Sequence, residues 1–278
     1  MYQTIVSAGT LNQHLNRDDW VIFDCRFNLM DTGAGLTAYQ QGHIPGAHYL
    51  HLDNDLSSAI TPDSGRHPLP APEKLAHILG QAGVSSHTQV VVYDDCGGAM
   101  AARAWWLLRW LGHDAVAVLD GGYPLWLQNY SGSTDIPKAT INGFESACRD
   151  TMNLSTAQLL TELGGSDTLL VDARAEERFL GKAEPIDPIA GHVPGAVNRP
   201  LTDNLDNGQF KSAGQLKTEW LELLRGVQPQ SVVHMCGSGV TACHNQLAME
   251  IAGLRGSRLY TGSWSEWIRD ASRPVAKD

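Results

Sequence analysis

The feature that most constrains the fold of this chain is an internal repeat. The segment VIFDCR at residues 21–26 resembles LLVDAR at residues 169–174, and each is followed by a nearly identical hexamer, GHIPGA or GHVPGA. Two further pairs follow in the same order, VVVYDDCGG with SVVHMCGSG and LDGGYPLW with YTGSWSEW. Four matched blocks in one order predict two copies of a single fold, each of about 130 residues, which is an ordinary domain size.

Each copy alternates strand and helix patterns. The largely apolar runs Gln89–Tyr93 and Ser231–Met235 are typical of strands that are buried on both faces. Helical periodicity follows each run, over Ala99–Leu111 and Val240–Gly253. The order strand, loop, helix, strand predicts an α/β fold in which each copy has a mostly parallel sheet flanked by helices.

The domain boundaries follow from the repeat and from the segment between its copies. We expect a first domain over residues 1–135, a linker over 136–150, where Gly, Ser and Pro replace clear periodicity, and a second domain over 151–278. The first copy is longer after its hexamer, where it carries DLSSAITPDSGRHPLP. Long loops in compact domains usually have a function or are disordered, so this insertion is a candidate functional loop.

Composition narrows the possible partners and the compartment. The formal net charge is -10, which disfavours nucleic acid and anionic membranes and means that a small anionic substrate needs local positive charge. The start of the chain lacks a signal-peptide pattern and no run reaches membrane-spanning length, so we expect a cytoplasmic protein. Five scattered cysteines predict reduced thiols, and without a CxxC pair we expect no metal and no other cofactor.

The strongest chemical signal is the loop CGSGVT at residues 236–241, between a predicted strand and a predicted helix. Its two glycines let successive N–H groups point inward, and the helix start adds free donors, so the loop should cradle an anion. Cys236 at the head of this cradle should be largely a thiolate and therefore a nucleophile.

A buried cysteine without a function is the common alternative, and we accept it for the other four, Cys25, Cys96, Cys148 and Cys243. In the first copy Asp95 aligns with Cys236, which predicts a catalytically silent first domain and one active site per chain.

The blocks GHVPGA, CGSGVTA and GSWSEW, spaced along a tandem repeat, resemble the rhodanese-type sulfurtransferases over essentially the whole chain. The resemblance implies that Cys236 carries a persulfide in a six-residue loop. The other loop residues would then line the substrate site: Gly237, Ser238, Gly239, Val240 and Thr241. Because the loop has no basic side chain, it is closer to the 3-mercaptopyruvate sulfurtransferases than to the thiosulfate-preferring rhodaneses.

A remote arginine can hold the carboxylate of mercaptopyruvate. The resemblance assigns this role to Arg178, which would otherwise be an exposed helix charge. These enzymes usually have a second arginine just before the Gly-His hexamer, where this chain has Ile186, and Lys182 is a possible substitute. Arg174 and its counterpart Arg26 occur in both copies, which favours a structural ion pair.

The resemblance also implies a proton relay of Ser238, His67 and Asp53, the last two from the longer first-copy segment. Without it, His67 is a loop histidine and Asp53 a turn residue. Both repeated hexamers contain a histidine, His43 or His192, so these two are expected to be structural. Four tryptophans should fill the core and the domain interface: Trp105, Trp106, Trp264 and Trp267.

Together these features predict transfer of sulfur from 3-mercaptopyruvate or thiosulfate, through Cys236, to cyanide or a thiol such as that of thioredoxin. Two alternatives remain open: a thiosulfate:cyanide sulfurtransferase, and a persulfide-carrier module without free turnover. A cysteine phosphatase is disfavoured, because its loop is one residue longer and has an arginine six positions after the cysteine, where this chain has Ala242.

Overall fold

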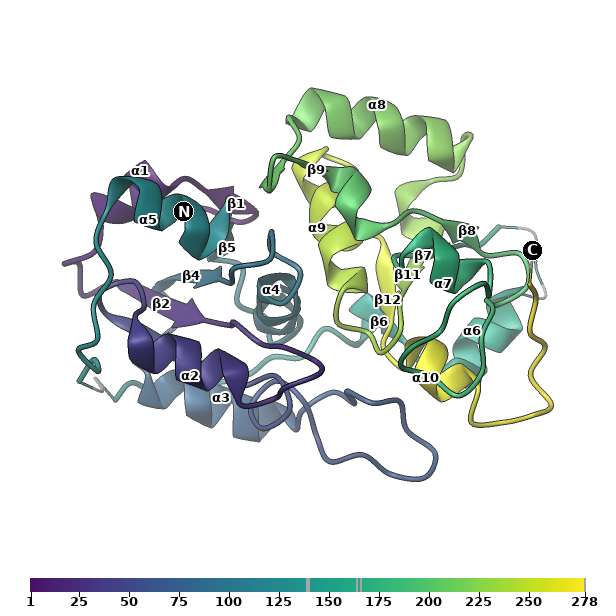
Figure 1. Ribbon diagram of the computed structural model, residues 1–278, viewed down its shortest axis with the longest axis horizontal. Coiled ribbons are helices and arrows are strands. Elements are labelled where there is room, and N and C mark those ends of the chain that lie inside the picture. The colour runs from purple at the N-terminus through teal and green to yellow at the C-terminus, as the bar shows by residue number, and fades with distance from the viewer. Residues whose placement is uncertain (139–140, 164, 166, 278) are drawn as a thin grey trace. The chain divides into compact units, whose positions relative to one another are not determined.

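The computed structural model describes residues 1–138, 141–163, 165 and 167–277, which form two compact units (Figure 1). The first unit comprises Met1–Ser58, Leu69–Arg149 and Asn207–Phe210, and the second comprises Ala59–Pro68, Asp150–Asp206 and Lys211–Asp278. Most of the insertion, Ala59–Pro68, is therefore part of the second unit, although its sequence belongs to the first copy.

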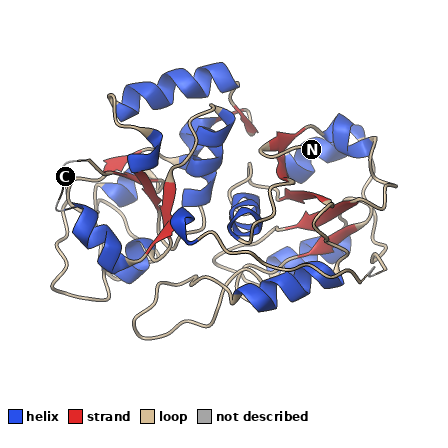
Figure 2. Ribbon diagram, turned by 180° about the vertical axis from the view of Figure 1, so that it is seen from behind, coloured by secondary structure: helices blue, strands red, loops and turns tan. Residues whose placement is uncertain are grey.

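The first unit is built on a five-stranded sheet in the order β1-β5-β4-β2-β3, with every pair of neighbours parallel. Helices cover both faces of the sheet (Figure 2). Its elements in chain order are β1 (Ile5–Val6), α1 (Ala8–Asn12), β2 (Trp20–Asp24), α2 (Ala34–Gln41), β3 (Ala47–Tyr49), α3 (Pro72–Gln81), β4 (Gln89–Tyr93), α4 (Ala101–Trp110), β5 (Val116–Leu119), α5 (Gly122–Asn129) and β10 (Gln209–Phe210).

The second unit repeats this sheet strand for strand, in the order β6-β12-β11-β7-β8, again with parallel neighbours. The predicted α/β fold with two similarly built copies is confirmed. Its elements are η1 (Asp150–Met152), β6 (Asn153–Leu154), α6 (Thr156–Leu163), β7 (Leu169–Asp172), α7 (Glu176–Phe179), β8 (Val197–Asn198), η2 (Leu201–Asn204), β9 (Leu205–Asp206), α8 (Ala213–Leu224), η3 (Pro229–Ser231), β11 (Val232–Met235), α9 (Ala242–Ile251), β12 (Arg258–Tyr260) and α10 (Ser263–Trp267).

Equivalent cores stabilise the two sheets. In the first unit, alternate residues of β4, Val91 and Tyr93, pack in one buried cluster with Leu11 of α1 and Trp126 of α5. In the second unit the corresponding cluster includes Val233 and Met235 of β11 and both tryptophans of α10. All four tryptophans that we expected in the core and the domain interface are at most 1% exposed, which confirms that they are buried. Such large apolar side chains dominate the hydrophobic stabilisation of a domain.

The segment predicted as a linker, residues 136–150, includes residues 139 and 140, which lie outside the described residues. Much of its remainder is bonded to the first unit. Asn142 donates through its backbone N–H to the Gly80 carbonyl at 2.9 Å and through Nδ2 to the Gly83 carbonyl at 2.7 Å. Ala147 donates to the Leu111 carbonyl at 2.9 Å. These bonds give the segment a fixed course along the first unit.

The helices are short, and α8 has 12 residues, whereas a bilayer-spanning helix needs about 20. Within the described part of the chain, no helix has the length and apolar character needed to cross a membrane.

Candidate active site

The loop Cys236–Thr241 connects the end of β11 to the start of α9. Its course requires a glycine at position 239, where φ is +78° and an added Cβ would lie 2.3 Å from the Thr261 carbonyl oxygen. Cys236 is buried, with 1% of its surface exposed. Its carbonyl accepts a hydrogen bond from the Trp264 N–H at 3.0 Å, so the start of α10 fixes the head of the loop.

Ser263 holds Cys236 from the other side, and the sequence did not identify it. Its Oγ accepts from the Cys236 N–H at 3.1 Å and donates to the Tyr260 carbonyl at 2.9 Å. Ser263 has φ of +53°, a left-handed conformation that costs a non-glycine residue about 1 kcal/mol or more. The first copy has Gly122 at this place, with φ of +57°. The sequence signal for Ser263 was that the second copy has a serine where the first copy has Gly122.

The first-unit counterpart of Cys236 is Asp94, so the alignment with Asp95 was wrong by one residue. In β4, Tyr93 pairs with Asp24, just as Met235 of β11 pairs with Asp172. The next residues are Asp94 and Cys236. The loop after Asp94 runs to α4 at Ala101, one residue more than in the second unit, and the sequence comparison had matched the loop glycines instead of the strands.

Asp94 shows what this kind of loop can bind. Its fully buried carboxylate accepts four backbone hydrogen bonds at 2.8–3.0 Å, through Oδ1 from Cys96 and Gly98 and through Oδ2 from Met100 and Ala101. The N–H groups of the loop and of the α4 start thus converge on an anion, as in other backbone nests. In the first unit the chain fills this cradle with its own carboxylate.

Two of the three predicted relay residues lie together. Nδ1 of His67 is 2.7 Å from Oγ of Ser238, and each residue is 5% exposed. Both residues belong to the second unit, which includes Ala59–Pro68. Asp53 belongs to the first unit, where its backbone N–H donates to Nδ1 of His51 at 3.1 Å. The role of Asp53 in the relay stays a prediction.

Arg178 is held by carboxylates instead of projecting freely from α7. Its Nη2 donates to Glu184 at 2.7 Å and to Asp187 at 3.2 Å, and its Nε donates to both oxygens of Glu184. Its side chain is 18% exposed. These contacts leave Nη1 uncommitted among the described residues, and fix the guanidinium in one orientation.

The prediction of a structural ion pair for Arg174 is confirmed. Its Nη2 donates to Asp172 at 2.7 Å and to the Gly191 carbonyl at 2.8 Å. Arg26 makes the same two contacts in the first unit, with Asp24 and Gly42, both at 2.6 Å. In each unit this pair ties the end of a strand to the Gly-His hexamer.

The hexamer histidines are structural, as expected. Nδ1 of His43 lies 2.8 Å from the Tyr39 carbonyl oxygen, and Nδ1 of His192 lies 2.8 Å from that of Phe179. Both rings are buried and stack on the aromatic side chain of the same residue that they bond. These contacts fix the hexamers to the preceding helices.

Lys182, the sequence candidate for a second cation, is exposed in the turn after α7. At the position of the missing arginine, the Ile186 N–H donates to Glu184 at 3.1 Å. Arg66, which the sequence did not identify, forms an ion pair through Nη1 with Asp187, and its backbone N–H donates to Ser265 at 3.0 Å. Its place beside His67 in the insertion, within GRHPLP, was the sequence signal.

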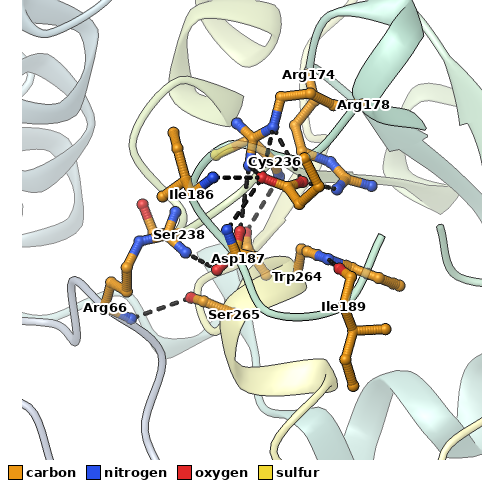
Figure 3. Close-up of polar contacts among 12 residues, drawn as sticks. Arg66, Arg174, Arg178, Ile186, Asp187, Ile189, Cys236, Ser238, Trp264 and Ser265 are labelled. Atoms are coloured by element: carbon orange, nitrogen blue, oxygen red, sulfur yellow. Dashed lines mark hydrogen bonds and ion pairs between the residues drawn. The ribbon is translucent and has the colours of Figure 1, made fainter. Parts of the chain in front are cut away.

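Figure 3 shows Arg66 and Arg178 in the same cluster of polar contacts as Asp187 and Cys236, and both guanidinium groups lie close to Gly237. A Cβ added to Gly237 would lie 3.0 Å from Nη2 of Arg66 and 3.6 Å from Nη1 of Arg178. The loop has no charged side chain of its own, but two guanidinium groups stand beside the residue that follows Cys236. This arrangement suits an anionic ligand.

The five cysteines are all free, as predicted. Cys25 and Cys243 are buried, but Cys96 and Cys148 are exposed, so burial was the wrong expectation for those two. Cys96 lies in the loop that follows β4, and Cys148 lies in the segment before the second unit. Burial, with Asp24 nearby, raises the pKa of the Cys25 thiol well above its ordinary value, which keeps it protonated.

No group of three or more His, Cys, Asp or Glu side chains within residues 1–138, 141–163, 165 and 167–277 could hold a metal ion.

Comparison with known proteins agrees with this geometry. The model of the rhodanese-like domain matches residues 7–129 and 155–270. A Pseudomonas aeruginosa protein named "Probable 3-mercaptopyruvate sulfurtransferase" is 46% identical over 98% of this chain and 97% of its own length. The thiosulfate sulfurtransferase of Mus musculus is 35% identical over 98% of this chain and 94% of its own.

A solved structure gives the same result. The crystal structure of SseA from Escherichia coli, described as showing the "rhodanese" fold of 3-mercaptopyruvate sulfotransferases, is 29% identical, with a TM-score of 0.81. The match covers 95% of this chain and 100% of that one. With two matching domains, a repeated sheet and a cysteine at the head of the second loop, the chain belongs to the rhodanese family.

Proposed function

We propose that this chain transfers sulfur from 3-mercaptopyruvate, through a persulfide on Cys236, to cyanide or to a thiol such as that of thioredoxin. Sulfurtransferase activity follows from membership of the family, and relatives with this activity match nearly the full chain. The donor, the acceptor and the residue roles below are our proposal, as are a cytoplasmic location and a catalytically silent first domain over residues 1–135.

The cradle around Asp94 is the observation that supports the persulfide. An aspartate carries its oxygens two bonds beyond Cβ, and the outer sulfur of a cysteine persulfide is also two bonds beyond Cβ. The loop that begins with Asp94 holds such an anion with four N–H groups. The loop Gly237–Thr241 also leads into a helix, and we assign its N–H groups to the negative outer sulfur.

The first half-reaction begins when the Cys236 thiolate attacks the thiol sulfur of 3-mercaptopyruvate. A sulfur–sulfur bond forms, the carbon–sulfur bond breaks, and its electron pair leaves on the enolate of pyruvate. The proton lost by the substrate thiol ends on the methyl carbon of pyruvate, so the step consumes no external oxidant or reductant. In the second half-reaction, cyanide or a thiolate takes the outer sulfur and frees Cys236, which predicts ping-pong kinetics.

Ser238 and His67 are suited to move that proton. Their 2.7 Å contact is short enough for direct proton transfer, and both side chains are shielded from bulk water. We assign the hydroxyl to the contact with substrate and the imidazole to the exchange of the proton. Asp53 would orient the imidazole from the first-copy segment.

The charge balance of the site favours a monoanionic donor. Three arginines lie in a network with three carboxylates, so the cluster is formally neutral before the thiolate is counted. A dianion such as thiosulfate gains less from such a cluster than a single carboxylate that fits a guanidinium. The network consists of Arg66, Arg174 and Arg178 with Asp172, Glu184 and Asp187.

The test is a parallel steady-state assay with 3-mercaptopyruvate and with thiosulfate, together with mass spectrometry after exposure to donor alone. We expect a gain of one sulfur atom confined to Cys236, faster with 3-mercaptopyruvate, and no gain in Cys236→Ser. Faster turnover with thiosulfate would reverse the donor assignment. Sulfur on another cysteine, or turnover by Cys236→Ser, would overturn the mechanism, and labelling without steady-state product would indicate a persulfide carrier.

Arg178 provides the second test. In Arg178→Ala we expect KM for 3-mercaptopyruvate to rise at least tenfold, with a smaller change in kcat, because a charge-assisted contact to the carboxylate is lost. Arg255→Ala, which removes an arginine with 70% of its side chain exposed, is the control. Equal KM values in the two variants would show that Arg178 does not hold the donor.

A further inference from the structure

We propose that Arg66, from the segment Ala59–Pro68, is the second arginine of the donor-carboxylate site. It takes the role of the arginine that is absent at position 186, where this chain has Ile186. This inference rests on the proposed function and names the residue pair that selects a donor with a carboxylate. Arg66 and Arg178 would each give one N–H-bearing nitrogen to the same carboxylate.

The position of Arg66 is fixed by two contacts. Nη1 forms an ion pair with Oδ1 of Asp187, and the backbone N–H donates to Ser265 of α10 at 3.0 Å. Asp187 binds Arg178 through its other oxygen at 3.2 Å, so one buried carboxylate aligns both guanidinium groups. A pair of arginines fixed in this way loses little side-chain entropy when an anion binds.

Each arginine keeps one amino group available. Among the described residues, nothing accepts from Nη2 of Arg66 or from Nη1 of Arg178, and these two nitrogens are 3.0 and 3.6 Å from a Cβ placed on Gly237. Both nitrogens therefore lie close to one point beside Gly237, the residue that follows Cys236. A carboxylate between the two nitrogens can accept from both while the donor sulfur meets the thiolate.

The charges of Cys236 and Arg178 affect the pKa of Arg66. Burial lowers the pKa of its guanidinium, and the negative charge of the Cys236 thiolate opposes this shift, while neighbouring Arg178 adds to it. An arginine still remains protonated at neutral pH. A donor carboxylate would further offset the repulsion between the two arginines, so Arg66 and Arg178 are better stabilised together with a bound anion than without one.

The competing residue is Lys182, the cation that lies nearest in sequence to position 186. It is exposed in the turn after α7, and its only hydrogen bond among the described residues runs from its backbone N–H to the Glu177 carbonyl. Arg66 is partly buried, with 22% of its side chain exposed, and has the ion-pair partner Asp187, whereas no ion pair orients the exposed side chain of Lys182 among the described residues. Lys182→Ala is therefore the matched control.

The experiment measures persulfide formation on Cys236 in single turnover, by mass spectrometry, with two donors. One donor is 3-mercaptopyruvate and the other is mercaptoacetone, which has the same reacting carbons and no carboxylate. In Arg66→Ala we expect at least a tenfold higher concentration for half-maximal rate with 3-mercaptopyruvate and a less than threefold change with mercaptoacetone. Lys182→Ala should match the wild type with both donors.

A rescue variant separates binding from a structural effect. Arg66→Ala with Ile186→Arg should recover most of the lost affinity for 3-mercaptopyruvate, because a guanidinium returns to the site from another element. Equal behaviour of Arg66→Ala and Lys182→Ala, or equal loss with both donors, would overturn the role of Arg66. If the wild type forms no persulfide from 3-mercaptopyruvate, it is the proposed function that fails.

Discussion

The loops that follow β4 and β11 are built at equivalent places and hold different chemistry. The first has seven residues, Asp94–Met100, and its leading carboxylate occupies the backbone cradle. The second has six residues, Cys236–Thr241, and leads with a thiol that stops one atom short of the carboxylate oxygens. The fold therefore builds the same anion-binding loop in both units. The first side chain of each loop decides whether the bound anion is a permanent carboxylate or, as proposed, a persulfide that exists for part of a catalytic cycle.

The surroundings of the two loops differ as well. Beside Gly237 are two arginines, and Oγ of Ser238 lies against His67. The strands also differ just before the loops, because buried His234 in β11 takes the place of Val92 in β4. At equivalent positions, the second unit therefore has a thiol where the first has a carboxylate, and an imidazole where the first has an apolar side chain. Each difference can be reversed by substitution.

The largest effect is expected from placing the first-unit residue in the second loop. Cys236→Asp should lose at least about 10³-fold in sulfur transfer, because no nucleophile remains. If both loops cradle an anion, this variant should also unfold at a higher temperature than Cys236→Ser, whose hydroxyl supplies no charge. Calorimetry of the two variants makes the comparison. If Cys236→Asp is less stable than Cys236→Ser, the second loop does not bind a carboxylate as the first loop does.

The next effect concerns the first loop. Asp94→Ala should destabilise the first unit by about 3 kcal/mol, because four backbone N–H groups, three of them in buried hydrogen bonds, lose their acceptor. Amide hydrogen exchange of the loop measures this change. Asp95→Ala is the matched control, since Asp95 is exposed and its substitution should change the free energy of unfolding by about 0.5 kcal/mol or less. A larger effect at Asp95 than at Asp94 would support Asp95 as the counterpart of Cys236.

The third effect is a dependence of stability on pH. Burial lowers the pKa of His234 to about 3, and neither ring nitrogen has a partner among the described residues. The unfolded chain then binds the extra proton, so stability is full above about pH 6.5 and falls as the pH drops toward the folded value. Between pH 7 and pH 5 the loss from this residue should be about 2 kcal/mol.

His234→Val, which restores the first-unit residue, should remove this loss. Urea unfolding of the second unit at pH 7 and pH 5 tests it, with exposed His87→Val as the control. An unchanged pH dependence in His234→Val would assign the acid sensitivity to other groups.

Much of this comparison was visible in the sequence because it depends on local patterns. The repeat and the strand and helix periodicities predicted the two sheets, and β4 was predicted with its bounds, Gln89–Tyr93. The glycine-flanked cysteine at the head of a helix marked the loop at Cys236. Local patterns suffice for such features, since a buried strand and a curled loop each need particular residues within a short stretch.

The parts that the sequence did not predict depend on long-range contacts. Arg66 meets Asp187 across 121 residues of sequence, and nothing in GRHPLP indicates that it joins the second unit. The counterpart of Cys236 was misplaced because a one-residue difference in loop length appears only when the strands are paired. Ser263 was missed because its left-handed backbone is not specified by its residue type.

Ser263 is the subject of the smallest prediction. It is a positioning residue, because its Oγ accepts from the Cys236 N–H and thereby holds the backbone of the nucleophile. Ser263→Ala should lower kcat by about three- to tenfold with little change in KM, since a hydrogen bond of about 1 kcal/mol is lost at the nucleophile and not at the donor site. Ser263→Gly should show the same kcat, yet be the more stable of the two by about 1 kcal/mol, because glycine accepts the left-handed backbone that Gly122 has in the first unit. Steady-state kinetics and thermal unfolding of both variants distinguish the two effects. A full kcat in Ser263→Ala would mean that the backbone strain at this position serves the fold alone, and the two loops would then differ only in the side chains that lead them and surround them.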